Sequence, residues 1–353
     1  MKTTLLFVVA ALLTLPLSAE TAMKDAPADR PEIQYAKALR PGDTIMFVAP
    51  AGELIEKRVA LAKKNLEAMG FKVIVPEDLF RQRGYLAGDD QTRADELMRA
   101  FADPEVDAIF PGTGGYGTTR ILDLLDFEVI AANPKVFIGF SDITALHTAI
   151  HQKTGLITFH SPNPQWGLGS DNGFHPIAEK YWWRAILAKA YEKDSDGPGW
   201  VYDFKGMEDA PQVETVAPGV GQGRVIGGNL SLVAATIGTP YEMDDEGAVL
   251  FLEDVREAPY RVDRMLQQLK SAGKLDDLSG VILGQFTRVD ADDQREWSLE
   301  KVFDDFFADA PYPVIRNFPA GHVRFNATIP IGGLVEVDAD RKVVTLLEDP
   351  VTH

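Results

Sequence analysis

The sequence predicts an α/β fold with two domains, the first of them built on a doubly wound parallel sheet. Short β-branched runs alternate with amphipathic segments from residue 43 to residue 159, which is typical of a parallel sheet covered by helices on both faces. A length of 353 residues exceeds the usual size of one domain. Hydrophobic residues make up 45% and charged residues 25%, so the composition is globular and excludes general disorder.

The elements of the first half follow from the spacing of apolar residues. The expected strands are 44–48, 71–75, 106–110, 135–138 and 156–159, and the expected helices between them are 54–69, 92–101, 118–125 and 143–151. In sheets of this kind, ligands bind at the carboxyl ends of the strands. We therefore expect functional residues in the loops that follow the strands.

The second half is less regular at its start. Residues 164–222 are rich in Gly, Pro, Asp and Trp, and only 177–191 has helical spacing, so this stretch is interpreted as a linker with an excursion over one face. Its tryptophans are typical either of a lid that stacks on a ring-bearing substrate or of ordinary packing. Beyond it the expected helices are 230–237, 260–272 and 297–307, and the expected strands are 248–252, 281–283, 334–337 and 343–347.

The N-terminus predicts a secretory signal peptide over residues 1–19. A lysine at position 2 precedes an apolar run over 5–15 that is too short to span a bilayer, and an uncleaved anchor is the alternative. Residues 20–35 are then a mature N-terminal extension, residues 36–163 the first domain and residues 223–353 the second. We expect an exported protein, periplasmic or secreted, with no integral membrane span after signal cleavage.

Charge and cysteine content restrict partners and chemistry. Lys and Arg number 35 against 53 Asp and Glu, a net charge of −18 that repels polyphosphates and makes nucleic acid a poor partner. The absence of cysteine excludes disulfides, thiolate metal sites and a cysteine nucleophile. Covalent catalysis must then use Ser, Thr, Lys or a carboxylate. Nothing in the sequence requires a metal or organic cofactor, and a homodimer is left open.

Ser141 is the first candidate for a nucleophile. The run Gly139-Phe140-Ser141-Asp142 follows an expected strand and opens an expected helix, which exposes a serine hydroxyl at the edge of the sheet. The same turn leaves the Asp142 N–H free at a helix N-terminus, as in a nucleophile elbow. Ile143 replaces the second glycine of the G-x-S-x-G pattern, however, and the alternative is that Ser141 or Asp142 only caps the helix.

Each of the other residues that could take part in catalysis or binding is by itself weak evidence for a functional site. The glycine-rich run 112–117 suggests a phosphate cradle, a turn whose amides face an oxyanion, or a tight connection. His147 and His151 have a metal-binding spacing without a third ligand, which favours solvated or core histidines. His322 lies in a Pro/Gly loop, and Glu253 ends an expected strand.

Six stretches taken together resemble one family. They are 39–43 (LRPGD), 114–126 (GGYG, Arg120 and LLD), 134–142 (PKVFIGFSD), 227–239 (GGNL and GT), 252–264 (LEDVREAPYR and DR) and 321–333 (GH and PIGG). In this order they resemble the LD-carboxypeptidase (muramoyltetrapeptide carboxypeptidase) family of serine peptidases, which includes microcin-immunity peptidases. The resemblance covers nearly the whole mature chain and implies a flavodoxin-like first domain with a smaller, swivelling α/β second domain.

The resemblance also implies a Ser–His–Glu triad. Ser141 matches the nucleophile, His322 the general base and Glu253 the carboxylate that orients it. The implied oxyanion hole consists of the backbone N–H groups of Asp142 and Gly115. The implied reaction is hydrolysis, through an acyl-enzyme, of the L,D-amide bond that releases terminal D-alanine from a murein tetrapeptide.

Substrate recognition and two rival functions stay open. Tyr116, Asn229 and Arg261 are the expected substrate contacts. The family commonly has an arginine where this chain has Thr113, which puts the identity of the peptide substrate in question. The arginines that could bind the substrate's carboxylate instead, or that only form salt bridges, are Arg120, Arg224, Arg261 and Arg324. The alternatives are a microcin-immunity-like peptidase that cleaves peptidyl-nucleotide or other amides, and a non-catalytic periplasmic binding protein.

Overall fold

The computed structural model describes residues 30–188, 199–208, 212–289 and 297–353. The expected signal peptide, most of the expected extension 20–35 and the end of the expected helix 177–191 lie outside the described residues. None of the helices in the described ranges combines the length and apolar character needed to cross a membrane.

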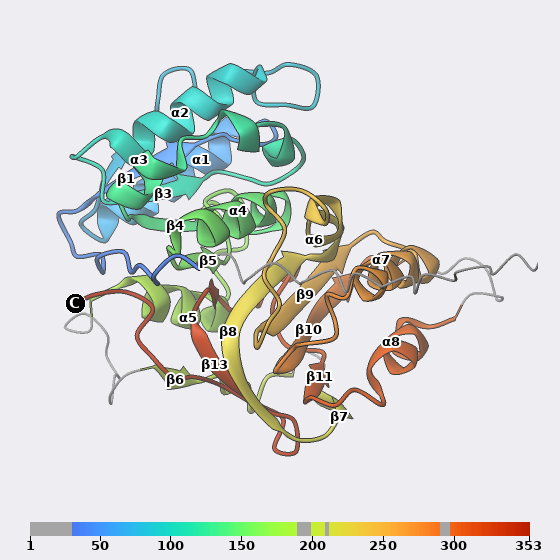
Figure 1. Ribbon diagram of the computed structural model, residues 1–353. Coiled ribbons are helices and arrows are strands. Elements are labelled where there is room, and N and C mark those ends of the chain that lie inside the picture. Colours follow the sequence, from blue (N-terminus) through green and yellow to red (C-terminus); the bar gives the residue numbers. More distant parts are fainter. Residues whose placement is uncertain (1–29, 189–198, 209–211, 290–296) are drawn as a thin grey trace, which may run out of the picture. The chain divides into compact units, whose positions relative to one another are not determined.

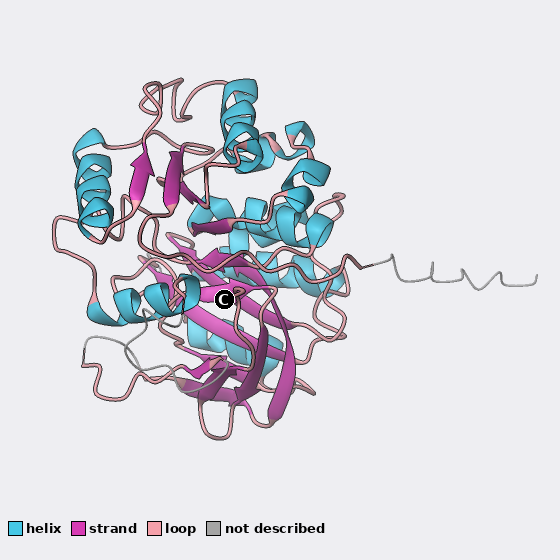
Figure 2. Cartoon of the chain, turned by 90° about the vertical axis from the view of Figure 1, so that its left-hand side faces the viewer, coloured by secondary structure: helices cyan, strands magenta, loops and turns pink. Residues whose placement is uncertain are grey.

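The first sheet has six strands in the order β12-β5-β4-β3-β1-β2. Its strands are β1 (Thr44–Val48), β2 (Lys72–Ile74), β3 (Ala108–Pro111), β4 (Val136–Gly139), β5 (Thr158–His160) and β12 (Ile329–Ile331). All pairs are parallel except β12 with β5. The connecting helices are α1 (Glu56–Ala68), α2 (Asp90–Ala102), α3 (Phe127–Ala132) and α4 (Thr144–Thr154), which lie on both sides of these strands (Figure 2).

The second sheet has eight strands in the order β6-β14-β13-β8-β9-β10-β11-β7, and it is mixed and curled. Its strands are β6 (Trp200–Val201), β7 (Glu214–Ala217), β8 (Val220–Asn229), β9 (Val249–Val255), β10 (Gly280–Thr287), β11 (Val314–Arg316), β13 (Leu334–Asp338) and β14 (Val343–Leu346). The run β8-β9-β10-β11 is parallel, and the outer pairs are antiparallel. Helices α6 (Leu230–Thr236), α7 (Pro259–Ser271) and α8 (Leu299–Phe307) lie on one side of β9, β10 and β11 (Figure 1), and α5 spans Pro176–Ile186. The predicted two-domain α/β class is confirmed.

Several local predictions differ from the structure. The expected helix 118–125 is two short 3-10 turns, η1 (Thr118–Arg120) and η2 (Leu122–Leu124), and α3 after it was not expected. Helix α3 begins where Asp126 accepts hydrogen bonds from the N–H groups of Glu128 and Val129, so a cap rather than periodicity marks its start. The stretch 164–222 contributes β6 and β7 to the second sheet, although its composition resembles a linker.

Contacts between α4 and the carboxyl end of β8 connect the two sheets close to the candidate site. The backbone N–H of Asn229 donates to the Thr144 hydroxyl at 3.0 Å. A Cβ atom added at Gly228, whose φ is +136°, would lie 2.7 Å from the same hydroxyl oxygen. Only glycine permits both this backbone conformation and this close approach. The carboxyl ends of β4 and β9 are thereby held near one another.

Candidate active site

Ser141 has the strained backbone of a nucleophile elbow. Its φ is +64°, in the left-handed region that residues with a side chain rarely occupy, and it starts the 3-10 turn η3 (Ser141–Ile143) directly after β4. Within the described part of the chain, no side-chain cap hydrogen bond is made at the start of η3 or α4. The Asp142 carboxylate accepts instead from the N–H of Thr118 at 2.9 Å. The capping interpretation of this turn therefore lacks a capping contact, whereas strain of this kind clusters at functional sites.

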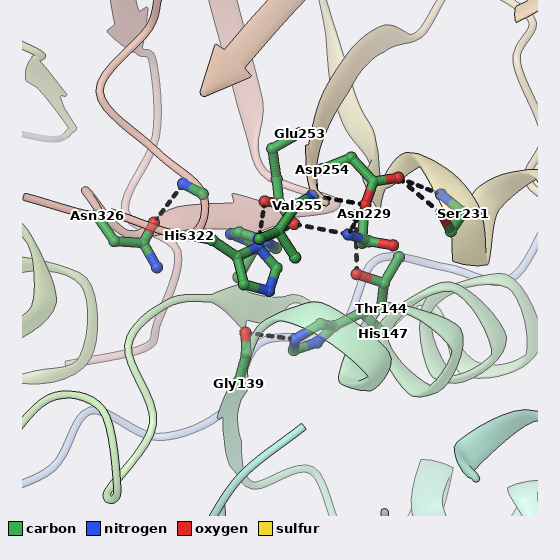
Figure 3. Close-up of polar contacts among 12 residues, drawn as sticks. Gly139, Thr144, His147, Asn229, Ser231, Glu253, Asp254, Val255, His322 and Asn326 are labelled. Atoms are coloured by element: carbon green, nitrogen blue, oxygen red, sulfur yellow. Dashed lines mark hydrogen bonds and ion pairs between the residues drawn. The ribbon is translucent and has the colours of Figure 1, made fainter. Parts of the chain in front are cut away.

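Glu253 and His322 form a close pair. Oε2 of Glu253, a fully buried residue on β9, lies 2.7 Å from Nδ1 of His322 in the loop between β11 and β12 (Figure 3). Phe140, which precedes Ser141, packs against the His322 ring with centroids 5.0 Å apart. The structure thus brings the His–Glu pair next to the turn that carries Ser141.

A glycine makes the approach of the carboxylate possible. A Cβ atom at Gly321 would lie 2.8 Å from Oε2 of Glu253, and the residue has φ +124°. Its N–H donates to the Asn326 side chain at 2.8 Å, which holds the loop just before His322 (Figure 3). A side chain at this position would push His322 away from Glu253.

The pair shifts the pKa values of both partners. Burial by itself would raise the pKa of Glu253, but the nearby charge and hydrogen bond of His322, together with the neighbouring imidazole of His160, outweigh it and lower the pKa to about 2. Burial would lower the pKa of His322, but the charge and hydrogen bond of Glu253 raise it above its ordinary 6.5. The carboxylate is therefore ionised at neutral pH and stabilises an imidazolium on His322.

A second polar cluster, consisting of Asn229, Ser231 and Asp254, supports Glu253. The Asn229 amide donates to Glu253 at 3.3 Å and to Asp254 at 3.0 Å, and Ser231 donates its N–H and hydroxyl to Asp254 (Figure 3). Burial, followed by the charge of Glu253, raises the pKa of Asp254 to about 6. Asn229 is an expected substrate contact, and in the structure its amide group holds the two carboxylates. The sequence did not predict the roles of Asp254 and Ser231. The only indication of these roles in the sequence is that Asp254 follows Glu253 and that Ser231 lies close to Asn229.

The glycine-rich turn lies against the elbow. A Cβ atom added at Gly114 would lie 2.8 Å from the Ser141 Cβ and 3.2 Å from the Asp142 nitrogen. The Gly114 carbonyl accepts from the Gly52 N–H at 3.0 Å. Because the C=O and N–H of a trans peptide point in opposite directions, the Gly115 N–H faces away from Gly52. The expected oxyanion residues, Asp142 and Gly115, thus belong to two backbone segments in close contact.

A buried arginine donates hydrogen bonds to the end of the same turn. Arg93, on α2, donates to the carbonyl oxygens of Gly117 at 2.9 Å and of Pro50, and it pairs with Asp90. Asp90 also pairs with Arg120 at 2.6 Å. Arg120 is therefore occupied in an ion pair, as is Arg224, which lies 2.8 Å from Glu348.

Aromatic side chains are exposed beside the turn. Tyr116 is 46% exposed and packs edge-on against Tyr85, and Trp166 is 53% exposed. The Trp166 indole N–H donates to Thr113 at 3.1 Å, so the residue that replaces the family's arginine anchors this ring. The other tryptophans of the stretch 164–222 are packed rather than lid-like: Trp182 and Trp200 are buried, and Trp183 stacks on Phe71.

The remaining candidates lie in other environments. Arg261 is exposed on α7, 3.6 Å from Glu257 and next to Tyr260. His147 and His151 are buried, and burial lowers their pKa values to about 3 and about 4. His147 bonds to the Gly139 carbonyl and to Thr158, which fixes the end of β4. Across the described ranges, His, Asp and Glu side chains form no group of three that could hold a metal ion.

The fold and this site together define a class: a two-domain α/β protein with a strained serine at the end of a parallel strand and a buried His–Glu pair beside it. Comparisons with known proteins agree with this description. Residues 45–161 match the LD-carboxypeptidase N-terminal domain, and residues 222–337 match the LD-carboxypeptidase C-terminal domain. The chain therefore belongs to the LD-carboxypeptidase family, peptidase family S66, whose members are serine LD-carboxypeptidases.

Three relatives show how similar the chain is to known members. The probable murein peptide carboxypeptidase of Bacillus subtilis is 39% identical over 311 residues, 88% of this chain and 93% of that one. The murein tetrapeptide carboxypeptidase of Pseudomonas aeruginosa is 28% identical over 299 residues, 84% of this chain and 94% of that one. The structure of the microcin C7 self-immunity protein MccF of Escherichia coli superposes with a TM-score of 0.77 at 26% identity, covering 90% of this chain and all of that one. The family predicted from the motifs is confirmed.

Proposed function

We propose that the protein is a serine carboxypeptidase that releases terminal D-alanine from murein tetrapeptides by cleaving the preceding L,D-amide bond. The observation that carries the proposal is the 2.7 Å contact between Glu253 and His322 beside Ser141, whose φ of +64° marks a nucleophile elbow. The names of two relatives, a murein peptide and a murein tetrapeptide carboxypeptidase, support the choice of substrate.

In the proposed reaction, Oγ of Ser141 attacks the amide carbon while His322 takes the hydroxyl proton. The oxyanion that forms accepts hydrogen bonds from the N–H groups of Asp142 and Gly115. The C–N bond then breaks, and His322 gives its proton to the departing amine of D-alanine. Water hydrolyses the acyl-Ser141 ester, with His322 taking the proton of the water and returning it to Ser141. Glu253 stabilises the imidazolium during both halves.

The test is release of D-alanine from a murein tetrapeptide by the purified protein, followed by mass spectrometry of the tripeptide. A tetrapeptide that ends in L-alanine is the matched substrate control and should remain intact. Ser141→Ala should lower kcat by a factor on the order of 10⁴ without changing the melting temperature. Ser271→Ala, which changes an exposed serine at the end of α7, should leave kcat unchanged. Wild-type turnover by the Ser141→Ala variant would refute the assignment.

Cleavage of an amide on a nucleotide conjugate is the second candidate. The likeness to MccF, which spans 90% of this chain, favours it, and solved complexes of that protein contain aspartyl sulfamoyl adenosine and glutamyl sulfamoyl guanosine. The same triad would serve because the bond is again an amide. A comparison of kcat/KM for the tetrapeptide and for an aminoacyl sulfamoyl nucleoside distinguishes the two candidates, and preference for the nucleoside would overturn the first.

We further propose that the enzyme acts outside the cytoplasm, in the periplasm or as a secreted protein. The support is the sequence of residues 1–19, where a lysine and a short apolar run have the pattern of an export signal. Its substrates would then be stem peptides of the cell wall or released fragments. Fractionation of cells expressing the full chain, with N-terminal sequencing of the mature protein, tests this proposal. Full-length protein in the cytoplasm would refute it.

A further inference from the structure

His160 is a buried histidine that the proposed reaction does not use. It is the last residue of β5 and has no exposed surface. Neither ring nitrogen has a hydrogen-bond partner within the ranges that the structure describes. Buried polar groups are nearly always hydrogen-bonded, and exceptions in a native fold call for an explanation. An imidazole that is buried at the carboxyl end of β5 without a hydrogen bond is therefore a candidate for a role in the active site.

The surroundings of His160 fix its ring without hydrogen bonds. In the parallel pairing of β4 and β5, His160 lies opposite Gly139, two residues before the nucleophile candidate. The rings of Phe140 and Phe251 meet the imidazole edge-on, with centroids 6.2 Å and 5.0 Å away. Phe251 on β9 and Phe140 in the turn after β4 thus restrict the orientation of the imidazole.

The Nε2 atom of this ring faces the carboxylate of the His–Glu pair. It lies 3.6 Å from Oε1 of Glu253, while Nδ1 of His322 lies 2.7 Å from Oε2 of the same carboxylate. The carboxylate of Glu253 thus contacts one imidazole through each of its oxygens. Asn229 also donates to Oε1, at 3.3 Å, so neither oxygen is left without a donor (Figure 3).

We propose that His160 is a positioning residue, whose Nε2–H holds Oε1 of Glu253 so that Oε2 stays directed at His322. The role rests on the proposed triad, and it acts on the base only through the carboxylate. A separation of 3.6 Å is longer than a hydrogen bond, but such contacts in a substrate-free site often tighten when substrate binds. The proton belongs on Nε2 because a bare nitrogen would repel the carboxylate oxygen.

Four titratable groups lie near this ring or contact Glu253, and they must be considered in a pH experiment. Glu253 and His322 are the pair itself. The pKa of His147, on α4, is lowered to about 3 by burial, so this residue stays neutral above pH 5. The pKa of Asp254 is raised to about 6 by burial and by the charge of Glu253, and it titrates in the range of interest. Asp254 is present in every variant below, so its titration contributes to each of the pH profiles that are compared.

The experiment compares His160→Phe, which removes the donor, with His160→Gln, whose amide N–H can replace Nε2–H. In His160→Phe the carboxylate is free to turn, so we expect kcat to fall about 10- to 100-fold with little change in KM. The pKa of His322, which Glu253 raises, should fall, moving the acid limb of the kcat/KM profile to lower pH. His160→Gln should restore most of both losses. His151→Phe is the matched control for loss of a buried histidine, and it should change stability but neither kcat nor the acid limb.

Three outcomes would overturn the proposal. They are an unchanged kcat and acid limb in folded His160→Phe, a loss of kcat and melting temperature without movement of the acid limb, and no rescue by folded His160→Gln. Where the variants do not fold, ¹⁵N NMR of the wild-type histidines decides: the proposal requires the Nε2–H tautomer at His160, and an Nδ1–H tautomer refutes it. This readout needs no substrate, so it can fail or succeed independently of the proposed murein activity.

Discussion

Replacing Glu253 with glutamine should destabilise the protein within a defined window of pH. The substitution keeps the shape of this fully buried side chain and removes its charge, which lies 2.7 Å from Nδ1 of the partly exposed His322. The folded-state pKa of Glu253 is about 2, against its ordinary 4.5. At 1.36 kcal/mol per pKa unit, this difference corresponds to about 3 kcal/mol of folding free energy.

The two partners set the limits of the window. The pKa of Glu253 is lowered by folding, so its contribution is present above pH 4.5 and is lost as the pH falls through about 2. The pKa of His322 is raised, so its contribution is complete below pH 6.5 and is lost as the pH rises through the folded-state value. The difference in stability between wild type and Glu253→Gln should therefore be largest between about pH 4.5 and 6.5 and smaller on both sides.

Urea unfolding followed by tryptophan fluorescence, from pH 3 to pH 8, measures this difference. Glu105→Gln, on an exposed stretch between α2 and β3, controls for the loss of one negative charge and should give a small, flat difference. The kcat of Glu253→Gln should fall by a factor on the order of 10⁴, since the imidazolium loses its partner. A stability difference that is independent of pH, or largest at pH 8, would refute the assignment of the ion pair.

Two further predictions concern the turn beside Ser141. Gly114→Ala places a methyl group 2.8 Å from the Ser141 Cβ and 3.2 Å from the Asp142 nitrogen, at a backbone position without positive φ, so the turn or the elbow must shift. Steady-state kinetics should show kcat falling about 10²- to 10³-fold. Unchanged kinetics would show that the turn does not border the reacting carbonyl. Thr113→Val removes the hydroxyl that accepts hydrogen bonds from Trp166 and Gln165, so KM should rise several-fold while kcat stays nearly constant. Steady-state kinetics measures both constants, and Thr92→Ser, a substitution away from the turn, is the control. An equal loss in kcat would place Thr113 in the chemical step instead.

The sequence was most informative where function depends on short local patterns. The elbow at Ser141 follows from a strand, a tight turn and a helix start within ten residues, and the carboxyl-edge position of Glu253 follows from the apolar run before it. His322 lies in an irregular loop, and only the order of the family's motifs distinguishes it from a surface histidine. Asp254 and His160 carried no signal of their own, because their roles arise from packing between residues on different strands.

The path of the chain around His322 explains how one site can depend on both sheets. The loop that carries His322 leaves β11 of the second sheet and enters β12, which pairs with β5 of the first sheet, Ile329 opposite His160. The loop that carries His322 is therefore anchored at one end to each sheet. A swivel of the second sheet relative to the first must either strain this loop or break the pairing of β12 with β5, and both would disturb the position of His322. Pairing of β12 thus sets the range of domain motion that is compatible with an assembled triad.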